Sequence, residues 1–344
     1  AAASAYQGYK NEETFSLGKK FAIDGITGSI LEMPGHNWPY NHDGDLDLHR
    51  PHVDELILQC QKCGGNMKRV KEVIDVWFDS GAMPFAQCHW PFSEKLEYPA
   101  DFISEGIDQT RGWFYTLHAV GALMGKGPAY KNVISLGHIL DEKGEKMSKS
   151  KGNVVDPWEV INKYGIDALR WYFFTINPPG EPKRFVIRDV EERLRRFVLT
   201  LSNVLSFYKM HATEKSKIKN QKSKISLLDN WIISRLHQTI KVVRNNLDEY
   251  EVAQASRPID GFVDDLSRWW LRRSRKRFSG KERENVLAVL GLALEELSKL
   301  IAPFTPFLAE HIWQELNNRS SVHLADYPKP QIKLIDKKLE EQMD

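Results

Sequence analysis

Hydrophobic residues are spaced in two different ways along this chain, and the spacing changes near residue 186. Before it, short apolar runs are separated by turn-rich segments, which predicts strands at 72–81, 100–106 and 132–140. After it, apolar residues recur at helical spacing. Two stripes are continuous: Ile232, Leu236, Ile240, Val243 and Leu247, and then Leu287, Leu290, Leu294, Leu297 and Ile301. The sequence therefore predicts an α/β part followed by an antiparallel all-α bundle.

Residue types predict where two helices of the α/β part begin. Asp108 is a good N-cap for a helix that runs from the strand at 100–106 to about residue 124. Asp156, followed by Pro157 and by Glu159 at the third helical position, predicts a capping box. The loop before Asp156 is therefore predicted to be pinned at both ends and free in the middle.

Composition narrows the class of protein. A length of 344 residues predicts two domains, and a net charge of +2 means that any nucleic-acid surface must come from local clustering. Three cysteines favour a reducing compartment, and neither a secretory signal nor a run of eighteen apolar residues is present, so we expect a soluble, cytoplasmic protein without a membrane partner. The first residues are Ala-Ala-Ala-Ser and no complete Rossmann half precedes the loop, so we expect part of a longer protein.

Cys60 and Cys63 stand two residues apart with two glycines after them, a spacing typical of the tight turn of a zinc knuckle. A closed tetrahedral site needs four ligands. No second Cys-x-x-Cys is present, and Cys88 with His89 is only a weak candidate for completing the set. We therefore interpret Cys60 and Cys63 as half of a zinc ribbon whose other cysteines precede residue 1.

The loop at 141–157 carries four lysines, two serines and two glycines, and it follows the apolar run at 132–140. Most charged loops are solvated tips, although these ammonium and hydroxyl groups could also close over a polyphosphate. The string Lys146-Met147-Ser148-Lys149-Ser150 favours the second interpretation, because it resembles the KMSKS loop of class I aminoacyl-tRNA synthetases. That resemblance implies that Lys146 and Lys149 are catalytic and that Met147, Ser148 and Ser150 contact ATP.

A second cluster of candidates surrounds the helix that follows the strand at 100–106. Glu105 and Gly106 end that strand beside a helix N-terminus, which is where ligands bind in open α/β sheets. Gln109 and Trp113 are four residues apart and project from one face of the helix. A hydrogen-bonding amide beside an apolar wall suits an α-amino acid with a hydrocarbon side chain.

The segment 105–114 resembles isoleucyl-tRNA synthetases more than valyl or leucyl ones, and Trp-Phe-Asp-Ser at 77–80 is similar to a segment that lines their amino-acid pocket. By that resemblance Glu105 and Gly106 contact the adenylate, Gln109 the amino group, and Trp77 with Trp113 the side chain. Gly137 and His138, before the lysine loop, are expected to contact the nucleotide through backbone groups, and the His138 side chain is expected either to act by charge or to make a structural hydrogen bond.

Two lysine- or arginine-rich segments lie in the helical half. The lysine-rich stretch 209–224 lacks periodicity, and a solvated linker explains it better than an RNA contact. The second segment has Trp269 and Trp270 as buried anchors and predicts a phosphate-binding face, with a salt-bridged structural face as the alternative. The candidate tRNA ligands on it are Arg268, Arg272, Arg273, Arg275 and Lys276, with Arg277 extending the same face.

Taken together, the resemblance implies the second half of a Rossmann-type class I synthetase catalytic domain followed by an antiparallel helical anticodon-binding bundle. We expect a connective region at 1–72, the catalytic half at 73–185, the bundle at 186–330 and a loosely held tail at 331–344. The Asp-Ala-Leu-Arg string at 167–170 is similar to the family's passage from catalytic domain to bundle.

The implied function is isoleucine–tRNA ligation. ATP and isoleucine would form isoleucyl-adenylate, with Mg²⁺ as cofactor and Zn²⁺ as a further candidate, and the isoleucyl group would pass to tRNA(Ile). We expect a monomer. A His-Ile-Gly-His string and an editing domain are absent from the sequence, so the 344 residues by themselves are expected to be inactive. Two alternatives stay open: a valyl-tRNA synthetase, and a tRNA-binding module without chemistry.

Overall fold

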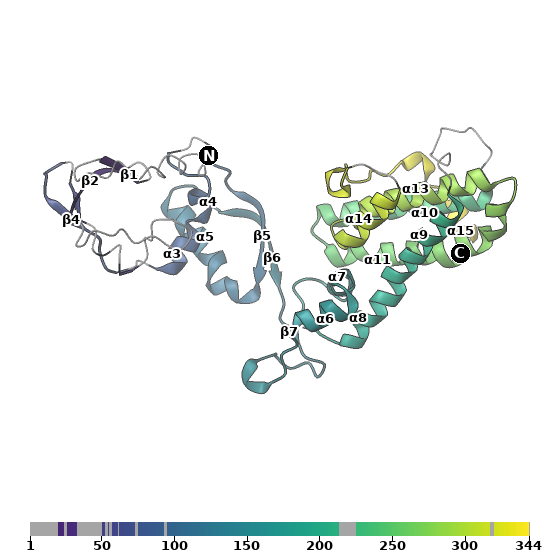
Figure 1. Cartoon of the computed structure of the whole chain (residues 1–344), viewed down its shortest axis with the longest axis horizontal. Helices are drawn as coiled ribbons and strands as arrows, with labels where there is room; N and C mark the ends of the chain where they lie inside the picture. Colours follow the sequence, from purple (N-terminus) through teal and green to yellow (C-terminus); the bar gives the residue numbers. More distant parts are fainter. Residues whose placement is uncertain are drawn as a thin grey trace. The chain divides into compact units, whose positions relative to one another are not determined.

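The computed structural model describes residues 20–23, 26–32, 50–51, 54, 57–60, 62–72, 75–92, 95–212, 225–316 and 320–343. The chain divides into two compact units. Unit 1 is Ala1–Asp101 with Gln109–Lys131, and unit 2 is Phe102–Asp108 with Asn132–Asp344. Figure 1 labels their helices and strands.

Among the described residues, unit 1 begins with a four-stranded antiparallel sheet in the order β1-β2-β3-β4. Its strands are β1 (Lys20–Ile23), β2 (Ile26–Glu32), β3 (Ile57–Gln59) and β4 (Asn66–Lys68). Gln59 is opposite Asn66 in the register, so Cys60 and residues 62–65 lie in the connection between β3 and β4 of a hairpin.

The strand predicted at 72–81 was wrong, because residues 76–81 form a helix. In α3 (Val76–Gly81) the Asp75 carboxylate accepts the N–H of Trp77 at 2.8 Å, which caps the helix. After α4 (Met83–Ala86), the chain returns in α5 (Trp113–Leu123), which packs on α3. The contact is close at Gly81, where a Cβ would lie 2.7 Å from the Thr116 carbonyl oxygen. The cap and this contact outweigh the alternation of apolar residues.

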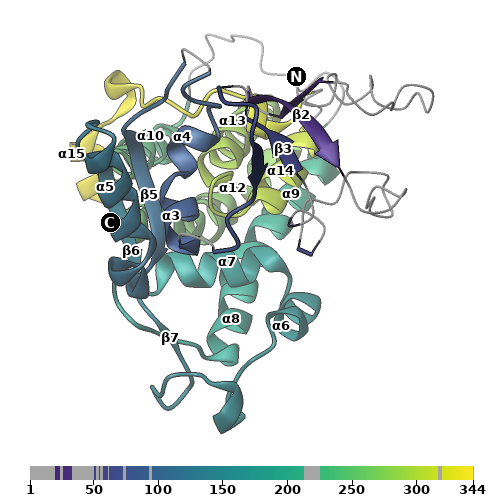
Figure 2. The ribbon, with the colours of Figure 1, turned by 90° about the vertical axis from the view of Figure 1, so that its left-hand side faces the viewer.

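β5 (Ala100–Gly106) and β6 (Tyr130–Leu136) pair with each other and lie side by side in both views (Figures 1 and 2). The strand predicted at 100–106 is confirmed. The strand predicted at 132–140 is confirmed as far as Leu136 but is not buried, since Val133 exposes 47% and Leu136 40% of its surface. In the described part of the chain this sheet has only these two strands, and two strands alone cannot cover their own faces.

The first part of unit 2 packs three helices beside a short parallel strand pair, β7 (Ile139–Leu140) with β8 (Lys183–Arg184). The helices are α6 (Pro157–Tyr164), α7 (Ile166–Thr175) and α8 (Ile187–Arg193). Asp156 caps α6 as predicted, although its carboxylate accepts the N–H of Trp158 rather than that of Glu159. Their apolar faces, together with Phe185 after β8, form a small core: Val160, Ala168, Leu169, Tyr172, Phe185 and Val190.

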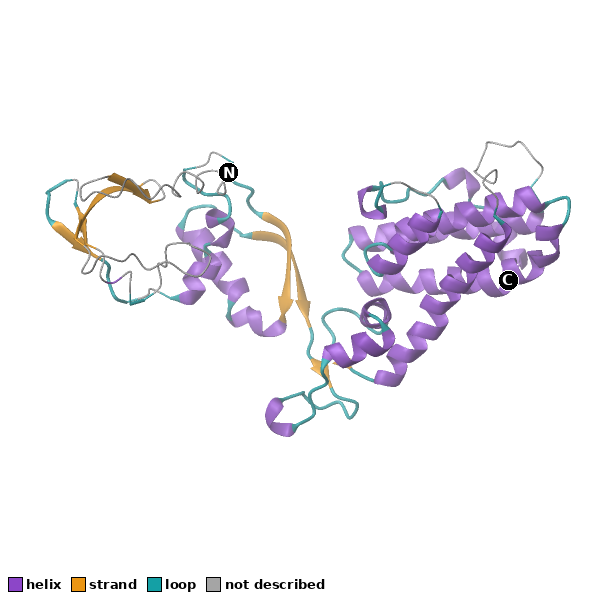
Figure 3. Ribbon diagram, viewed as in Figure 1, coloured by secondary structure: helices purple, strands orange, loops and turns teal. Residues whose placement is uncertain are grey.

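The rest of unit 2 is helical, as Figure 3 shows. Its longer helices are α9 (Leu199–His211), α10 (Leu227–Asp248), α11 (Val252–Asp264), α13 (Arg283–Ile301), α14 (Pro306–Glu315) and α15 (Lys337–Met343). The shorter pieces are the π-helical segments η4 (Leu194–Val198) and η5 (Asp265–Leu271), α12 (Arg272–Ser274), and the 3₁₀ turns η6 (Arg275–Ser279), η7 (Val322–Leu324) and η8 (Ile332–Leu334). No helix in the described residues is long and apolar enough to cross a bilayer.

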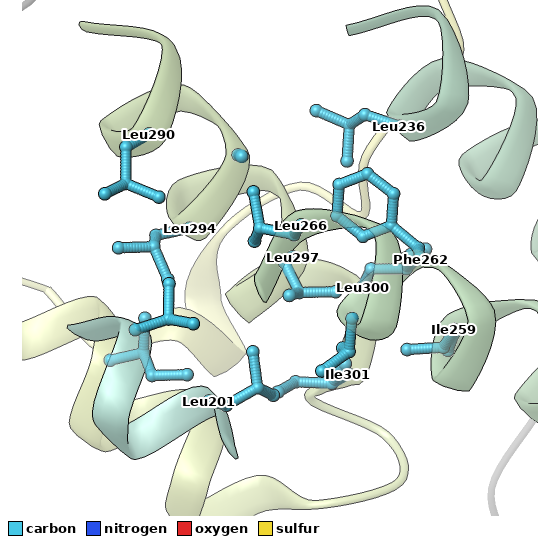
Figure 4. Close-up of a cluster of buried hydrophobic side chains, with 14 of the residues drawn as sticks. Leu201, Leu236, Ile259, Phe262, Leu266, Leu290, Leu294, Leu297, Leu300 and Ile301 are labelled. Atoms are coloured by element: carbon cyan, nitrogen blue, oxygen red, sulfur yellow. The ribbon is translucent and has the colours of Figure 1, made fainter. Parts of the chain in front are cut away.

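Both predicted stripes face the main core of this bundle. Nine of their ten residues are buried, and the tenth, Leu247, is partly buried and packs against the core. Figure 4 shows how Leu294, Leu297 and Ile301 of α13 meet side chains from other helices, among them Leu236 of α10 and Phe262 of α11. The helical-period pattern therefore predicted this part of the fold correctly.

The prediction of a loosely held tail was wrong. Leu339 and Glu340 of α15 are buried, and α15 packs on α10. The Ser234 hydroxyl donates to the Glu340 carboxylate and accepts the Asp336 N–H at 2.7 Å. Polar contacts with α10 therefore hold residues 336–340 in place. The composition of the segment 331–344 did not indicate these contacts. Within the lysine-rich stretch, residues 213–224 lie outside the described residues.

Candidate functional site

Three side chains predicted to contact an amino acid lie together around Gly112 in unit 1. A Cβ at Gly112 would lie 2.5 Å from the Gln109 Oε1 and 3.2 Å from the Trp77 Cη2. The Trp113 N–H donates to the Gln109 Oε1 at 2.8 Å, and the Trp113 indole N–H donates to the Ser80 carbonyl at 3.0 Å. Trp77, Gln109 and Trp113 therefore form one group, the Gly112 cluster, in which a side chain larger than that of glycine would have to displace Gln109 and Trp77.

The start of α5 differs from the prediction that Asp108 caps it. Ile107–Arg111 form a 3₁₀ turn, η2, and α5 begins at Trp113. The capping bond comes from Gln109, whose amide oxygen accepts the N–H of Trp113. This bond fixes the orientation of the Gln109 amide. An amide oxygen has two lone pairs, so the capping bond is compatible with a second donor such as an ammonium group.

Glu105 and Gly106 close β5 in unit 2. The Glu105 side chain is exposed, and a Cβ on Gly106 would lie 2.6 Å from the Asp108 Oδ1. Asp108 thus turns back over Gly106 instead of capping α5. The strand end predicted to face an adenylate is therefore a tight corner with an exposed carboxylate beside it.

Gly137 and His138, which were predicted to contact a nucleotide, lie between β6 and β7. The Gly137 N–H donates to the Pro179 carbonyl at 2.9 Å, and a Cβ on Gly137 would run into the Glu181 carbonyl. The His138 carbonyl accepts the Lys183 N–H at 2.8 Å, while the His138 side chain is exposed. Glycine is needed at 137 because a neighbouring backbone approaches it directly.

Lys183, which sequence reasoning missed, stabilises the turn at residues 177–182, whose backbone contacts Gly137 after β6. Its buried ammonium group donates to the Asn177 carbonyl at 2.9 Å, the Asn177 Oδ1 at 2.5 Å and the Pro178 carbonyl at 3.0 Å. Burial lowers the pKa of Lys183. A lysine next to a Pro-Pro turn was the available signal, but nothing in the pattern showed that it would be buried.

The lysine loop begins after β7, and in Figures 1 and 2 it extends away from α6, α7 and α8. Ser148 and Ser150 stand close, with their hydroxyl oxygens 3.2 Å apart, and the exposed Lys151 pairs with Glu145 at 3.2 Å. The Lys146 side chain is exposed. Residues Lys149–Lys151 form a 3₁₀ turn, η3, but the side chain of Lys149 lies outside the described residues.

Met147 corrects the expectation that the middle of the loop is free. Its side chain packs against the small core formed by α6, α7 and α8. A thioether in that core ties the centre of the lysine string to the helices. Lys146 and Ser148 therefore flank an anchored residue.

The five candidate tRNA ligands in unit 2 are all exposed, and we call this set the basic face: Arg268, Arg272, Arg273, Arg275 and Lys276. The Arg273 guanidinium lies over the Trp269 ring, 3.3 Å from its centroid, and Arg268 pairs with Asp264 at 3.3 Å. The buried Trp270 anchors the segment as predicted. The segment is not one α-helix, since it passes from η5 through α12 into η6.

Arg277 does not extend the basic face. Its guanidinium donates to both carboxylate oxygens of Asp229, at 2.9 and 2.6 Å, and Asp229 is fully buried. Asp229 also accepts the Trp270 indole N–H at 2.9 Å and the Ser226 hydroxyl at 2.7 Å. Burial alone would raise the pKa of Asp229, but Arg277 and Ser226 hold it below its ordinary value. For Arg277, the structural alternative is correct.

Cys60 and Cys63 lie in the β3–β4 turn. The Gly64 N–H donates to the Cys60 carbonyl and the Cys60 N–H to the Gly65 carbonyl, both at 2.8 Å. Backbone N–H groups of Cys63 and Lys62 lower the pKa of the Cys60 thiol, which favours the thiolate that metals bind. In the described part of the chain no three His, Cys, Asp or Glu residues gather as metal ligands, so Cys88 and His89 do not complete this pair.

Comparisons with known proteins assign both parts of the chain to families. Residues 37–183 match the family described as tRNA synthetases class I (I, L, M and V), and residues 229–344 match the anticodon-binding domain of tRNA ligase. A chain of the agnB2 LeuRS–tRNA–LeuAMS ternary complex from Agrobacterium radiobacter K84 shares the fold, with a TM-score of 0.65 and 21% identity over 81% of this chain and 36% of that one.

Curated relatives are more similar to this chain in sequence than the LeuRS chain is. Isoleucine–tRNA ligase 2 of Bacillus cereus is 52% identical over 327 residues, 92% of this chain and 31% of the relative. Isoleucine–tRNA ligase of Dehalococcoides mccartyi is 48% identical over 318 residues, 87% of this chain and 31% of the relative. The chain thus spans about a third of the length of these curated relatives. The matched region covers 92% and 87% of this chain, respectively.

Proposed function

The chain belongs to the class I aminoacyl-tRNA synthetases, and we propose that it supplies part of the machinery of an isoleucine–tRNA ligase. One observation carries the proposal. About half of the residues are identical to those of isoleucine–tRNA ligases, and the matched stretch includes the Gly112 cluster and the lysine string. The valyl alternative is disfavoured because these relatives are isoleucine enzymes.

The proposed first reaction joins isoleucine to AMP. An oxygen of the isoleucine carboxylate attacks the α-phosphorus of ATP, the bond to the β-phosphate oxygen breaks, and pyrophosphate leaves with its electron pair. No protein nucleophile is needed, so the work is orientation and the stabilisation of charge on the leaving group. Lys146 and Lys149 would provide that charge stabilisation, with Ser148 and Ser150 as hydroxyl donors.

Mg²⁺ would neutralise charge on the phosphates of bound ATP. In nucleotide sites Mg²⁺ usually keeps several waters and is bound through substrate phosphates with one or two carboxylates. Cys60 and Cys63 would supply two ligands of a structural zinc ion, a role separate from the reaction.

The Gly112 cluster would hold the amino acid. Trp77 and Trp113 offer apolar surface to a branched hydrocarbon chain, and the oriented Gln109 oxygen would accept from the α-ammonium group. The exposed carboxylate of Glu105 and the corner at Gly106 would contact the adenylate. Gly137 and His138, with Met147 beside the string, would complete the nucleotide side.

In the second reaction a ribose hydroxyl of the terminal adenosine of tRNA(Ile) attacks the carbonyl carbon of the adenylate, an ester forms, the acyl–phosphate bond breaks, and AMP leaves. The basic face would contact phosphates of that tRNA, because five exposed cations with a stacked tryptophan fit a backbone-binding surface. We infer a cytoplasmic location, where ATP and tRNA are available, and a monomer as the working unit.

The test uses the natural protein that carries this sequence. Isoleucine-dependent exchange of labelled pyrophosphate into ATP is expected, with valine a poorer substrate by roughly 100-fold, the order known for discrimination of a single methylene. Calorimetric titration with isoleucine checks binding separately. A protein that binds tRNA but neither binds isoleucine nor catalyses exchange would instead be a binding module.

A further inference from the structure

One carboxylate organises the start of the lysine loop. The Asp141 Oδ1 accepts the N–H of Lys143 at 3.0 Å and the N–H of Glu145 at 2.8 Å. The Asp141 backbone N–H also donates to the Glu145 carbonyl at 2.8 Å, which closes a tight turn. The second carboxylate oxygen faces out of that turn and accepts the Asn153 amide N–H at 2.8 Å.

Asn153 carries this contact across to the lysine string. Its Oδ1 accepts the N–H of Ser148 at 2.9 Å. Its Nδ2 donates to Asp141 and, at 3.4 Å, to the carbonyl of Lys146. A single side chain therefore contacts the backbone on both sides of Met147, and Met147 is held by the small core.

The residue types are those that this geometry requires. Asn153 must accept from a backbone N–H and donate to a carboxylate, and a primary amide does both with one planar group. Asp141 must accept from three donors with two oxygens, which an ionised carboxylate does. The bond from Asn153, followed by that from the Glu145 N–H, lowers the pKa of Asp141, in keeping with an ionised partner.

We propose that Asp141 and Asn153 form a clasp that positions Lys146 and Ser148 for the transfer of the adenylyl group. Both are positioning residues, since they act through the backbone of the lysine string. The inference rests on the proposed function, because the string has a reaction to serve only if the protein activates an amino acid. It goes beyond the string itself, because neither residue belongs to it.

Preorganisation is what the clasp contributes. A lysine aimed at a leaving pyrophosphate stabilises charge best when its backbone does not have to be ordered in each turnover. Without the clasp, the turn at Asp141 and the string at Lys146–Ser148 lose their shared partner, while Met147 still holds the centre. Loss of the clasp should therefore lower kcat more than it weakens substrate binding.

Asn153→Asp and Asp141→Asn each break the central bond. The first sets two carboxylates face to face, and the second sets two amide NH₂ groups face to face. The swap Asp141→Asn with Asn153→Asp restores a donor and an acceptor. The amide introduced at position 141 accepts from the turn and donates to the carboxylate introduced at position 153, whose other oxygen accepts the Ser148 N–H. Only the 3.4 Å bond to the Lys146 carbonyl has no replacement in the swap.

The experiment measures kcat and KM for pyrophosphate exchange in the natural protein. Each single variant is expected to lower kcat about 10- to 100-fold with the isoleucine KM within about twofold, because the Gly112 cluster is untouched. The swap is expected to regain all but about fivefold of the loss, the signature of two directly coupled residues. Glu145→Gln is the matched control. It breaks the exposed pair with Lys151 but keeps every clasp bond, so its kcat should match that of the parent.

Three outcomes separate the possibilities. Single variants with parental kcat, or a swap as impaired as the singles, would overturn the clasp while leaving the proposed function standing. A parent without isoleucine-dependent exchange would overturn the proposed function, and the clasp with it. Amide hydrogen exchange at Ser148 shows whether the bonds were altered as designed: exchange should speed up in each single variant and slow again in the swap.

Discussion

Asp167 of α7 caps a helix far along the chain: its Oδ2 accepts the N–H of Leu308, 141 positions later and in the first turn of α14, at 2.6 Å. One turn along α7, Arg170 donates to the carbonyls of Pro303 and Phe304, both at 2.9 Å. The Asp-Ala-Leu-Arg string thus connects α7 to the start of α14, and we call this pair of contacts the α7–α14 joint. An anion meets the N-terminus of α14 and a cation meets the turn that precedes it, each matching the backbone groups it faces.

Asp167→Ala tests this joint. The Leu308 N–H would lose its partner in a buried site, so the free energy of unfolding should fall by about 1–3 kcal/mol. Asp167→Asn keeps the acceptor and should stay within about 1 kcal/mol of the parent. Urea unfolding followed by circular dichroism measures both values. Equal losses in the two variants would mean that the charge, rather than the cap, carries the effect.

The same pair of variants predicts a pH trend. Burial raises the pKa of Asp167, so the folded state holds the protonated form more readily than the unfolded chain does. Its contribution to stability is therefore greatest below the ordinary aspartate pKa of about 3.9 and declines as pH rises through the raised value. Asp167→Asn should gain stability relative to the parent as pH increases over that range, and no such gain would contradict the burial argument.

Asp229 predicts the opposite trend. Its folded pKa is held low, so its contribution is present above about pH 3.9 and is lost as pH falls below that value. Asp229→Asn leaves Arg277 without its main partner and should cost about 3 kcal/mol at pH 7. The difference in unfolding free energy between parent and variant should shrink as pH falls from about 5 toward about 2. A difference independent of pH would show that the ion pair is not its source.

Gly112→Ala tests the amino-acid site. The new methyl group would displace Gln109 and Trp77, whose nearest atoms lie 2.5 and 3.2 Å from its position. The isoleucine KM should rise about 10- to 100-fold, because misplacing a binding group by about an ångström has effects of that order. Gly261→Ala in α11 is the control, since nothing lies within 4 Å of its Cβ position and alanine favours a helix. Equal isoleucine KM values in the two variants would remove the Gly112 cluster from the pocket.

Lys149→Ala tests the lysine string. Under the proposed function Lys149 stabilises charge on the departing pyrophosphate, so its loss should lower adenylate formation by on the order of 100- to 1,000-fold, with isoleucine affinity little changed. Lys163→Ala removes the same charge from α6, outside the string, and should leave the rate near the parental value. Pyrophosphate exchange measures both rates, and an undiminished rate in Lys149→Ala would withdraw its catalytic assignment.

Arg272→Ala with Arg275→Ala tests the basic face. Each phosphate contact removed should make the slope of log affinity against log salt shallower by about 0.7 to 0.9, so the pair should change it by up to about twice that amount. Isoleucine activation should be unaffected. Arg195→Ala with Arg196→Ala removes two exposed arginines that pair with Glu191 and Glu192, and is the matched control. Parental affinity and slope combined with a lower melting temperature would favour the structural alternative.

Features that depend on contiguous residues could be predicted from the sequence. The two stripes, the strand at 100–106 and the Asp156 cap all follow from local pattern, and the structure has them. Two failures involve local caps that the apolar pattern does not reveal, Asp75 before the helix at 76–81 and Gln109 before α5. The others involve distant partners. The helix at 76–81 also packs closely at Thr116, and the role of Arg277 depends on Asp229, 48 positions away. Composition at 331–344 could not show that Ser234 would receive Glu340.

The candidate site divides in the same way. The lysine string and the residues of the Gly112 cluster were identifiable from sequence because their strings resemble a family. Asn153 was missed because its significance lies in one planar amide that faces Asp141, twelve positions earlier, and the Ser148 backbone. Gly152, with a positive φ of 66° immediately before it, is the local signal that a defined turn precedes Asn153.

The π-helical segment Asp265–Leu271 sets the direction in which the basic face points. A π-bulge is in effect an α-helix with an inserted residue. Each residue of an α-helix turns the side chains that follow by about 100°. Deleting one residue within 265–271 would therefore restore a continuous α-helix and leave Arg272, Arg273 and Arg275 facing nearly the same way relative to the buried Phe262. In a regular α-helix the same deletion would turn these arginines by about 100°. The π-helical segment is thus the place in this helix where a one-residue deletion changes the orientation of the basic face least.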